Sequence, residues 1–194
     1  MPMTIVYSYL FPVLWIAYMT YWWRMAPAAE AKAAERHEAP GSRTLRLLLF
    51  IGAALLLALQ RTGITVLDKP FLPVGLWSFW AGAMVTAFGL LFSVWARVHL
   101  GNNWSQAVTI KQDHELITTG PYAFVRHPIY SGLLAGFLGC AIARGEWRGL
   151  VAVALIVAAL WPKLRLEEKW MQARFGDSYD VYCRRVARIV PHIL

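Results

Sequence analysis

The sequence predicts an all-α integral membrane protein with about five transmembrane helices. Of its 194 residues, 58% are hydrophobic and only 15% are charged, which is more apolar than an ordinary soluble domain. Long apolar segments recur along the chain and are separated by polar ones. A soluble fold of this size could not bury so much apolar surface, so lipid must surround part of it.

The first two apolar segments lie on either side of a polar stretch. Residues 1–23 carry no charge and are followed by Arg24. A signal peptide would begin with basic residues, so we predict a retained first transmembrane helix. Residues 26–40 predict a short polar helix or a surface extension. A second apolar segment runs from about Leu45 to Leu67, and the arginines near its ends would extend toward the lipid headgroups.

Three further apolar segments complete this prediction. They run from about Val74 to Ala96, from Pro128 to Ala143 and from about Trp147 to Leu164. Only residues 144–146 separate the last two, which predicts a tight antiparallel hairpin. Glycines give the fourth helix a face without side chains, which we expect to pack closely against the fifth helix. The pattern Gly132-x-x-x-Gly136 also allows dimerisation, so the oligomeric state stays open.

The basic residues predict the orientation of the chain. Fifteen of the 19 Lys and Arg residues fall in the segments 24–46, 97–128 and 163–194. Positively charged segments of membrane proteins tend to stay in the cytoplasm, which predicts an outside N-terminus and a cytoplasmic C-terminus. We expect one domain, in which residues 1–97 supply three transmembrane helices and residues 98–194 supply a polar loop, the hairpin and cytoplasmic helices.

The net charge of +8 does not indicate nucleic-acid binding. Basic cytoplasmic segments of a membrane protein explain the charge, and no nucleic-acid recognition motif accompanies it. Cys140 and Cys183 are far apart and neither belongs to a C-x-x-C pair. We therefore expect neither a disulfide nor a metal site.

The stretch 120–132, just before the fourth helix, carries the strongest functional signal. Gly120-Pro121 and His127-Pro128 each predict a turn, because proline disfavours helical geometry in the residue before it. Proline is common at the first position of a helix, so Pro128 predicts the start of the fourth helix. Arg126 and His127 would then lie beside free backbone amides, which suits a carboxylate or another anion.

The hairpin would bring a second polar segment to the same place. From residue 163 onward, the sequence predicts a helix leaving the membrane, a turn at Gly176 and an amphipathic helix before Pro191. Arg126-His127 and Glu167-Glu168 should then face each other at the membrane edge. Such a lining suits a ligand with separated charges, a flat ring and a vicinal diol, and S-adenosylmethionine is one such ligand. Structural ion pairs and an interfacial helix are the alternative explanation.

Two motifs resemble those of the isoprenylcysteine carboxyl methyltransferases and their prokaryotic relatives. The first runs from Asp113 to Gly132. The second comprises Glu167-Glu168, Phe175-Gly176, Tyr179, Tyr182, Arg184-Arg185-Val186, Arg188 and Pro191. The resemblance covers residues 100–191 and is absent from the first two helices.

The resemblance implies roles for individual residues. The S-adenosylmethionine-binding positions of the family match His114, Glu115, Leu116, Ile117, Tyr122, His127, Pro128, Tyr130 and Glu167. Arg126 and Glu168 join this set because they lie in the two facing polar segments. In the family, a basic residue four positions before the glutamate is associated with the substrate carboxylate. Here it is Lys163, where the eukaryotic enzymes have arginine, and lysine lacks the planar two-bond grip of arginine.

These expectations predict methyl transfer from S-adenosylmethionine to a lipophilic acceptor in the membrane, such as the carboxylate of a prenylated cysteine, with S-adenosylhomocysteine as the product. Lys163 and Glu167 would position the reactants, and Lys163 and Arg165 would bind the substrate. A carboxylate needs no general base near neutral pH, whereas an amine would need one, for which His114 or Glu168 are candidates. The cofactor would arrive from the cytoplasm, and the lipid or prenylated peptide substrate from the bilayer.

Three alternatives stay open. Phospholipid N-methyltransferases share similar motifs. Membrane sterol-type reductases, which use NADPH, have related C-terminal helices but generally more than five transmembrane segments. A non-enzymatic membrane scaffold would use the polar patches only as interfacial anchors and would bind neither cofactor.

Overall fold

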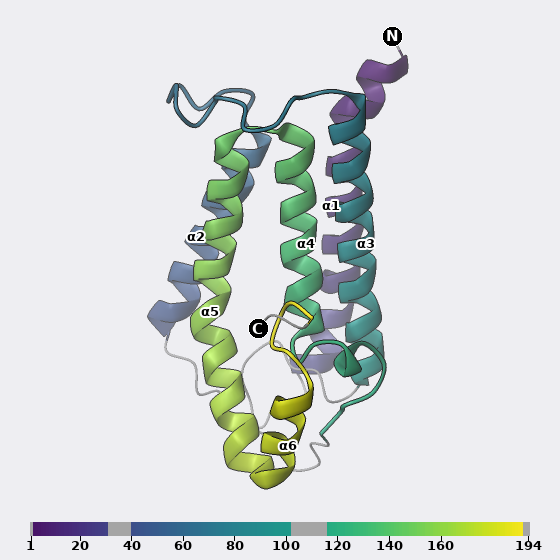
Figure 1. Ribbon diagram of the computed structural model, residues 1–194, viewed down its shortest axis with the longest axis vertical. Helices are drawn as coiled ribbons and strands as arrows, with labels where there is room; N and C mark the ends of the chain where they lie inside the picture. The colour runs from purple at the N-terminus through teal and green to yellow at the C-terminus, as the bar shows by residue number, and fades with distance from the viewer. Residues whose placement is uncertain (1, 31–39, 102–115, 192–194) are drawn as a thin grey trace.

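The computed structural model describes residues 2–30, 40–101 and 116–191, and most of these residues are helical (Figure 1). The helices are α1 (Pro2–Glu30), α2 (Pro40–Ala58), α3 (Leu76–Leu100), the short 3-10 helix η2 (Gly120–Ala123), α4 (Pro128–Arg144), α5 (Trp147–Phe175) and α6 (Asp177–Arg185). The helices α1 to α5 lie along the long axis, and α6 lies at one end. We call this end the α6 end. The opposite end, which carries the loop 59–75, is the loop end.

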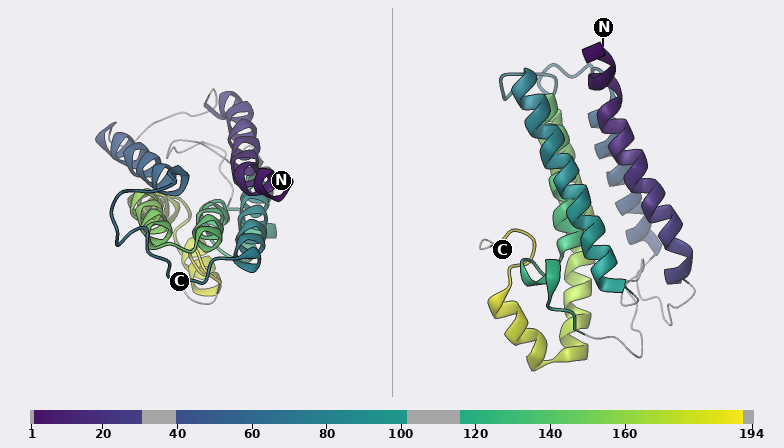
Figure 2. Two further views of the ribbon diagram at one scale, coloured as in Figure 1. Left: turned by 90° about the horizontal axis from the view of Figure 1, so that it is seen from above. Right: turned by 90° about the vertical axis from the view of Figure 1, so that its right-hand side faces the viewer.

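The helix α4 lies at the centre of the bundle. It packs between α3 and α5, while α2 packs on α5 and α1 contacts α3. Viewed along the long axis, α1 and α2 stand on the same side of the row formed by α3, α4 and α5 (Figure 2). The core between them includes Tyr18, Ala53, Phe137, Ile156 and Leu160.

Apolar helices support a multi-pass membrane protein. Within the described ranges, three helices, α2, α3 and α5, are long and apolar enough to cross a membrane, and α4 is a shorter apolar helix. Large apolar side chains such as Leu47, Trp80 and Phe88 point outward. Lipid is the solvent that such a surface requires. The count of five spans and the orientation of the chain stay predictions.

Small residues join α3 to α4. The residues at this contact are Gly82, Thr86, Gly89 and Ser93 on α3 and Gly132 and Gly139 on α4. A Cβ atom at Gly132 would collide with the carbonyl oxygen of Gly89, so the two backbones touch. The prediction that this glycine face packs against the fifth helix is therefore wrong. The small residues of α3 recur at helical spacing and form the smooth surface that this face requires.

The second apolar segment is shorter than predicted. We expected it to run to Leu67, but α2 ends at Ala58. In the loop that follows, the Thr62 hydroxyl donates to Asp68 at 3.0 Å and the Thr62 amide donates to the same carboxylate at 3.1 Å. Such local side-chain bonds compete with helical geometry, which explains the early end.

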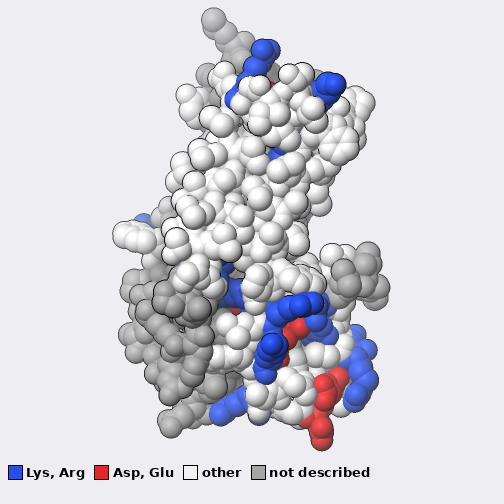
Figure 3. All heavy atoms as spheres, turned by 90° about the vertical axis from the view of Figure 1, so that its left-hand side faces the viewer, with Lys and Arg blue, Asp and Glu red and all other residues white. Residues whose placement is uncertain are grey.

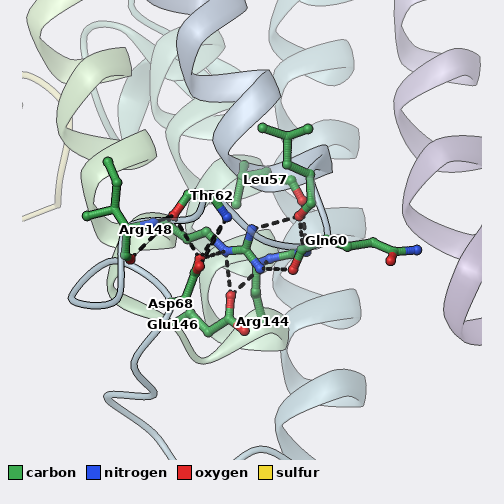
Figure 4. A network of polar contacts seen from close by, with 9 residues as sticks. Leu57, Gln60, Thr62, Asp68, Arg144, Glu146 and Arg148 are labelled. Atoms are coloured by element: carbon green, nitrogen blue, oxygen red, sulfur yellow. Dashed lines mark hydrogen bonds and ion pairs between the residues drawn. The ribbon is translucent and has the colours of Figure 1, made fainter.

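Arginines from the α4–α5 turn hold this loop (Figure 4). The Arg148 side chain is 1% exposed and donates to the carbonyl oxygens of Leu59 at 2.7 Å and Gln60 at 2.8 Å. Arg144 donates to the carbonyl oxygen of Leu57 at 2.9 Å. Carbonyl groups at the end of a helix lack helical partners, so the two guanidinium groups satisfy the end of α2.

The predicted hairpin and tail are confirmed. Gly145 adopts a left-handed conformation with φ of 67° and joins α4 to the antiparallel α5. The helix α5 continues past Leu164 to Phe175, beyond the apolar segment. The chain then turns at Gly176, with φ of 50°, into α6.

Candidate functional site

The candidate site lies at the α6 end, where α4 begins. Pro128 occupies the first turn of α4 and His127 is its N-cap, so the predicted start of this helix is confirmed. The single turn η2 comes just before it and buries Tyr122. The carbonyl oxygen of Tyr122 accepts a hydrogen bond from the Tyr182 hydroxyl at 2.6 Å, which ties η2 to α6.

The tail after α6 returns to the start of α4. The Arg126 amide donates to the Ala187 carbonyl oxygen at 2.8 Å, and the His127 amide donates to the Arg188 carbonyl oxygen at 3.1 Å. The Arg126 guanidinium donates to the Val186 carbonyl oxygen at 3.1 Å. The tail thus fixes the backbone of both residues that precede α4.

Two arginines and a histidine surround Glu168. The Arg126 Nε lies 3.2 Å from Oε1, the Arg188 Nη2 lies 2.7 Å from Oε2, and the His127 Nε2 lies 3.4 Å from Oε1. Partial burial raises the pKa of this carboxyl group, but hydrogen bonds from His127 and Arg188 and the Arg126 charge lower it more, to about 2. Glu168 lies in the polar part of α5, where charged residues recur too often for a membrane span. Both of its oxygens hold the tail to the start of α4.

Glu167 has different partners from its neighbour. Its Oε1 accepts a hydrogen bond from the Tyr130 hydroxyl at 2.5 Å and lies 3.8 Å from the Lys163 Nζ. Its Oε2 lies 3.6 Å from the His127 Nδ1. The side chain is 26% exposed, against 13% for Glu168. The prediction that Arg126-His127 and Glu167-Glu168 face each other is confirmed.

Aromatic rings cover one side of these charges. The rings of His127 and Tyr130 stack with centroids 5.7 Å apart and an interplanar angle of 17°. The Lys163 Nζ lies 5.8 Å from the centroid of the Tyr130 ring. A flat aromatic surface beside a carboxylate and an ammonium group can bind a polar ligand that carries both charge and a ring.

The two basic residues expected to bind substrate lie in different places. Lys163 lies over Tyr130, whereas the Arg165 guanidinium carbon lies 5.3 Å from the centroid of the Trp161 ring. Residues two positions apart point to opposite sides of a helix. Arg188 lies over the same Trp161 ring, at 5.4 Å. The structure therefore places Lys163, and not Arg165, against Tyr130 and Glu167.

Part of the predicted cofactor set cannot be placed. His114 and Glu115 lie outside the described residues. Leu116 and Ile117 are partly buried in an irregular segment that leads into η2.

His99 and Arg188 contribute to the site, although no role for either could be predicted from the sequence. The His99 Nε2 lies 2.9 Å from the Thr119 hydroxyl, and its ring stacks on Tyr122 at 6.5 Å. His99 is the single histidine of the apolar helix α3 and belongs to no motif. Arg188 belongs to the tail motif, but only the structure shows its contact with Glu168.

Charged side chains gather around this site. Figure 3 shows acidic and basic side chains mixed at the α6 end and a band without charge across the middle of the same face. Among the described side chains, no three His, Cys, Asp or Glu residues converge as metal ligands would. The groups offered to a ligand are a carboxylate, an ammonium group and aromatic rings.

Comparisons with known proteins identify relatives. A family model described as phospholipid methyltransferase matches residues 77–178, more than half of the chain. Protein-S-isoprenylcysteine O-methyltransferase of Schizosaccharomyces pombe is 36% identical over 104 residues, which are 50% of this chain and 43% of that protein. Protein-S-isoprenylcysteine O-methyltransferase B of Arabidopsis thaliana is 27% identical over 115 residues, 58% of each chain. The chain thus spans about half the length of the curated relatives it matches.

A solved structure has the same fold. It is a structure of the eukaryotic intramembrane Ras methyltransferase ICMT (isoprenylcysteine carboxyl methyltransferase), with a TM-score of 0.56 and 20% sequence identity. The match covers 81% of this chain and 54% of that chain. The family match begins in α3 and ends in α6, so it includes η2, the hairpin and every described residue of the candidate site up to Glu168. The resemblance predicted from the motifs is confirmed, and the chain belongs to the phospholipid methyltransferase family.

Proposed function

We propose that this protein is an integral membrane methyltransferase that uses S-adenosylmethionine to methylate a lipophilic acceptor, such as the carboxylate of a prenylated cysteine. The observation that carries the proposal is the convergence of Tyr130, Lys163 and Glu167 in a chain of a methyltransferase family. Relatives named protein-S-isoprenylcysteine O-methyltransferase support the acceptor class. Family membership favours this reaction over the NADPH-dependent reductase.

The residues present fit S-adenosylmethionine. Glu167 is partly exposed and its Oε2 lies 3.6 Å from the His127 Nδ1, so this carboxylate suits an ammonium group or ribose hydroxyls. The stacked rings of His127 and Tyr130 suit the adenine ring or the cationic sulfur. Tyr122, Leu116 and Ile117 would complete the binding surface. When bound, S-adenosylmethionine supplies a methyl group on a positively charged sulfur.

Glu168 has a structural role in this proposal. Because both of its oxygens engage Arg126, Arg188 or His127, Glu167 is the glutamate that faces the ligand. A carboxyl group with a pKa of about 2 is also a weak general base near neutral pH. An acceptor that needs no base fits this site better than an amine, which favours a carboxylate over a phospholipid amine.

The chain supplies orientation and water exclusion. Lys163 would hold the acceptor carboxylate as a cation, while Tyr130 and Glu167 hold the donor in line with it. The cofactor, when bound, would supply its methyl group to an oxygen of the acceptor carboxylate, which Lys163 would hold beside Tyr130 and Glu167. No proton moves in this step. The apolar parts of α4 and α5 would exclude water from it.

The proposed topology follows from the charge distribution. The α6 end carries most of the basic residues, so we place it in the cytoplasm, with the N-terminus outside. The acceptor then reaches the site from the bilayer, and the cofactor reaches it from the cytoplasm.

The proposal is tested by a methyl-transfer screen with the purified full-length protein in lipid nanodiscs. Radiolabelled S-adenosylmethionine is offered with a prenylated cysteine, a prenylated thiol or phosphatidylethanolamine, and the label is extracted into organic solvent. We expect the prenylated cysteine to carry the label in a form that base removes, as it removes the methyl group of an ester. Lys163→Gln should lower this transfer at least about tenfold, whereas Lys169→Gln, an exposed lysine on the same helix, should not.

Two results would contradict the proposal. One is no transfer to any acceptor. The other is thermal stabilisation by NADPH without stabilisation by S-adenosylhomocysteine, which would support the reductase alternative.

A further inference from the structure

Arg46 lies on the inward face of α2. The side chains that follow it at helical spacing, Phe50, Ala53 and Leu57, belong to the apolar core or pack against it. Its neighbours on the other face, Leu45, Leu47 and Leu48, are 59–60% exposed. Arg46 is itself partly buried, so it continues the core-facing row of α2 by one turn toward the α6 end.

The packing of α2 on α4 places Arg46 near the level of Tyr130. The rings of Phe50 and Phe137 contact each other, with centroids 6.2 Å apart. Both helices begin at the α6 end. At 1.5 Å per residue, Arg46 lies about 6 Å from Phe50 toward that end, and Tyr130 lies about 10 Å from Phe137. Helical side chains lean toward the N-terminus of their helix, so the long Arg46 side chain leans toward Tyr130.

The packing of α2 on α5 places Arg46 and Lys163 at a similar level along the bundle axis. Gly52 lies beside Leu155, because a Cβ atom added at Gly52 would be 3.7 Å from the Leu155 Cδ1. Arg46 is about 9 Å and Lys163 about 12 Å farther toward the α6 end. Two cations from different helices therefore lie near the level of the same tyrosine along the bundle axis.

A cation on the core-facing row of a membrane helix requires a reason. Ionisable groups in such positions are costly, and they mark paths or binding sites for charged ligands. An arginine that only reached the lipid headgroups could lie on the outer face of α2, beside Leu47 and Leu48, at lower cost. Arg46 instead lies on the inward face of α2, near the level of the tyrosine over which Lys163 lies.

We propose that Arg46 is a specificity-determining residue that, together with Lys163, binds the anionic head group of the lipophilic acceptor. The proposal rests on the proposed methyl transfer and deepens it, because it assigns to α2 the selection of a carboxylate over a neutral head group. The planar guanidinium can supply the two-bond grip that Lys163 lacks. The matched family region begins at residue 77, so Arg46 lies outside it.

The test uses one charged and one neutral acceptor analogue. N-acetyl farnesylcysteine is the methyl acceptor, and its amide is a competitive inhibitor of the same shape without the negative charge. In nanodiscs, Arg46→Gln should raise the KM for the carboxylate roughly 10- to 100-fold, while the inhibition constant of the amide changes less than about twofold. The KM of Arg46→Lys for the carboxylate should lie between those of Arg46→Gln and the wild type, because lysine keeps the charge. S-adenosylhomocysteine affinity, which also reports folding, should be unchanged in both variants.

Arg24→Gln is the matched control, because Arg24 is an exposed arginine at the same end of α1. It removes the same charge and should leave both constants unchanged. Equal changes in KM and in the amide inhibition constant, or no change in either, would overturn the role of Arg46. Transfer to phosphatidylethanolamine but not to the carboxylate would overturn it as well, while leaving a lipid methyltransferase. A wild-type protein that binds no S-adenosylhomocysteine and methylates nothing would overturn both proposals.

Discussion

Glu167 and Glu168 are adjacent in the sequence but point to different surroundings. Consecutive residues on a helix point about 100° apart. That rotation directs Glu168 to Arg126 and Arg188 and directs Glu167 to Tyr130. The sequence predicted that the pair would face the start of α4, but it could not divide their roles. The division depends on where the tail returns, and that contact joins residues far apart in the chain.

The pKa of Glu168 gives a prediction for stability at low pH. Because its folded-state pKa is about 2, against an ordinary value of 4.5, its ion pairs stabilise the fold fully above about pH 4.5. This stabilisation is lost as pH falls from 4.5 toward 2. Glu168→Gln should lower the free energy of unfolding by about 2 kcal/mol at pH 7.

The measurement is thermal unfolding of the wild type and of Glu168→Gln in detergent at pH 7 and pH 3. The difference in Tm between them should shrink at the lower pH. A difference of the same size at both pH values would show that Glu168 does not act through its charge. Asp177→Asn, which changes an exposed carboxylate on α6, serves as the control.

At the scale of the helices, some sequence patterns identify which helix packs against which, and others do not. The three-residue connection required α4 and α5 to be antiparallel neighbours, so the hairpin could be predicted. The glycine face of α4 was visible in the sequence, but a smooth face does not identify the helix that covers it. Its partner, α3, is a long apolar segment in the sequence, and only the structure shows that Gly82 and Gly89 in it meet α4. The end of α2 was missed because it depends on a turn between Thr62 and Asp68.

The contact of α3 with α4 predicts that Gly132→Ala is destabilising. A glycine to alanine change inside a helix usually stabilises by about 1 kcal/mol. At Gly132 the added Cβ would collide with the backbone of α3, so we expect a net loss of about 1–3 kcal/mol. Gly52→Ala is the matched control, because its Cβ would lie at an ordinary 3.7 Å from Leu155. The Tm of Gly132→Ala should lie well below the Tm of Gly52→Ala. Equal Tm values would contradict the contact between the two backbones.

The Arg148 contacts at the loop end predict an effect on stability that is independent of the candidate site. Arg148→Met leaves the carbonyl groups of Leu59 and Gln60 without their donors, so it should cost about 2–4 kcal/mol. Arg61→Gln removes an exposed arginine from the same loop and should cost less than about 0.5 kcal/mol. Both proteins should bind S-adenosylhomocysteine as the wild type does at a temperature where they are folded. Similar Tm values for the two variants would show that Arg148 does not hold the loop.

On the scale of the whole molecule, the two ends of the bundle have different tasks. The loop end joins α2 to the hairpin through buried arginines, and the α6 end gathers the charged and aromatic groups of the candidate site. The sequence predicted the membrane class, the hairpin and the position of the site because these follow from composition and from motifs. It did not predict the contribution of α2, since Arg46 belongs to no motif and its direction depends on the packing of Phe50 against Phe137.

The central claim is that the start of α4 and the polar part of α5 bind one small molecule beside Tyr130 and Glu167. Isothermal titration of S-adenosylhomocysteine into the purified protein tests it most directly. We predict saturable binding by the wild type and by the exposed-carboxylate control Asp177→Asn, with affinity reduced at least about tenfold in Glu167→Gln. Absence of binding at millimolar ligand, or equal affinity in Glu167→Gln and the wild type, would contradict the claim.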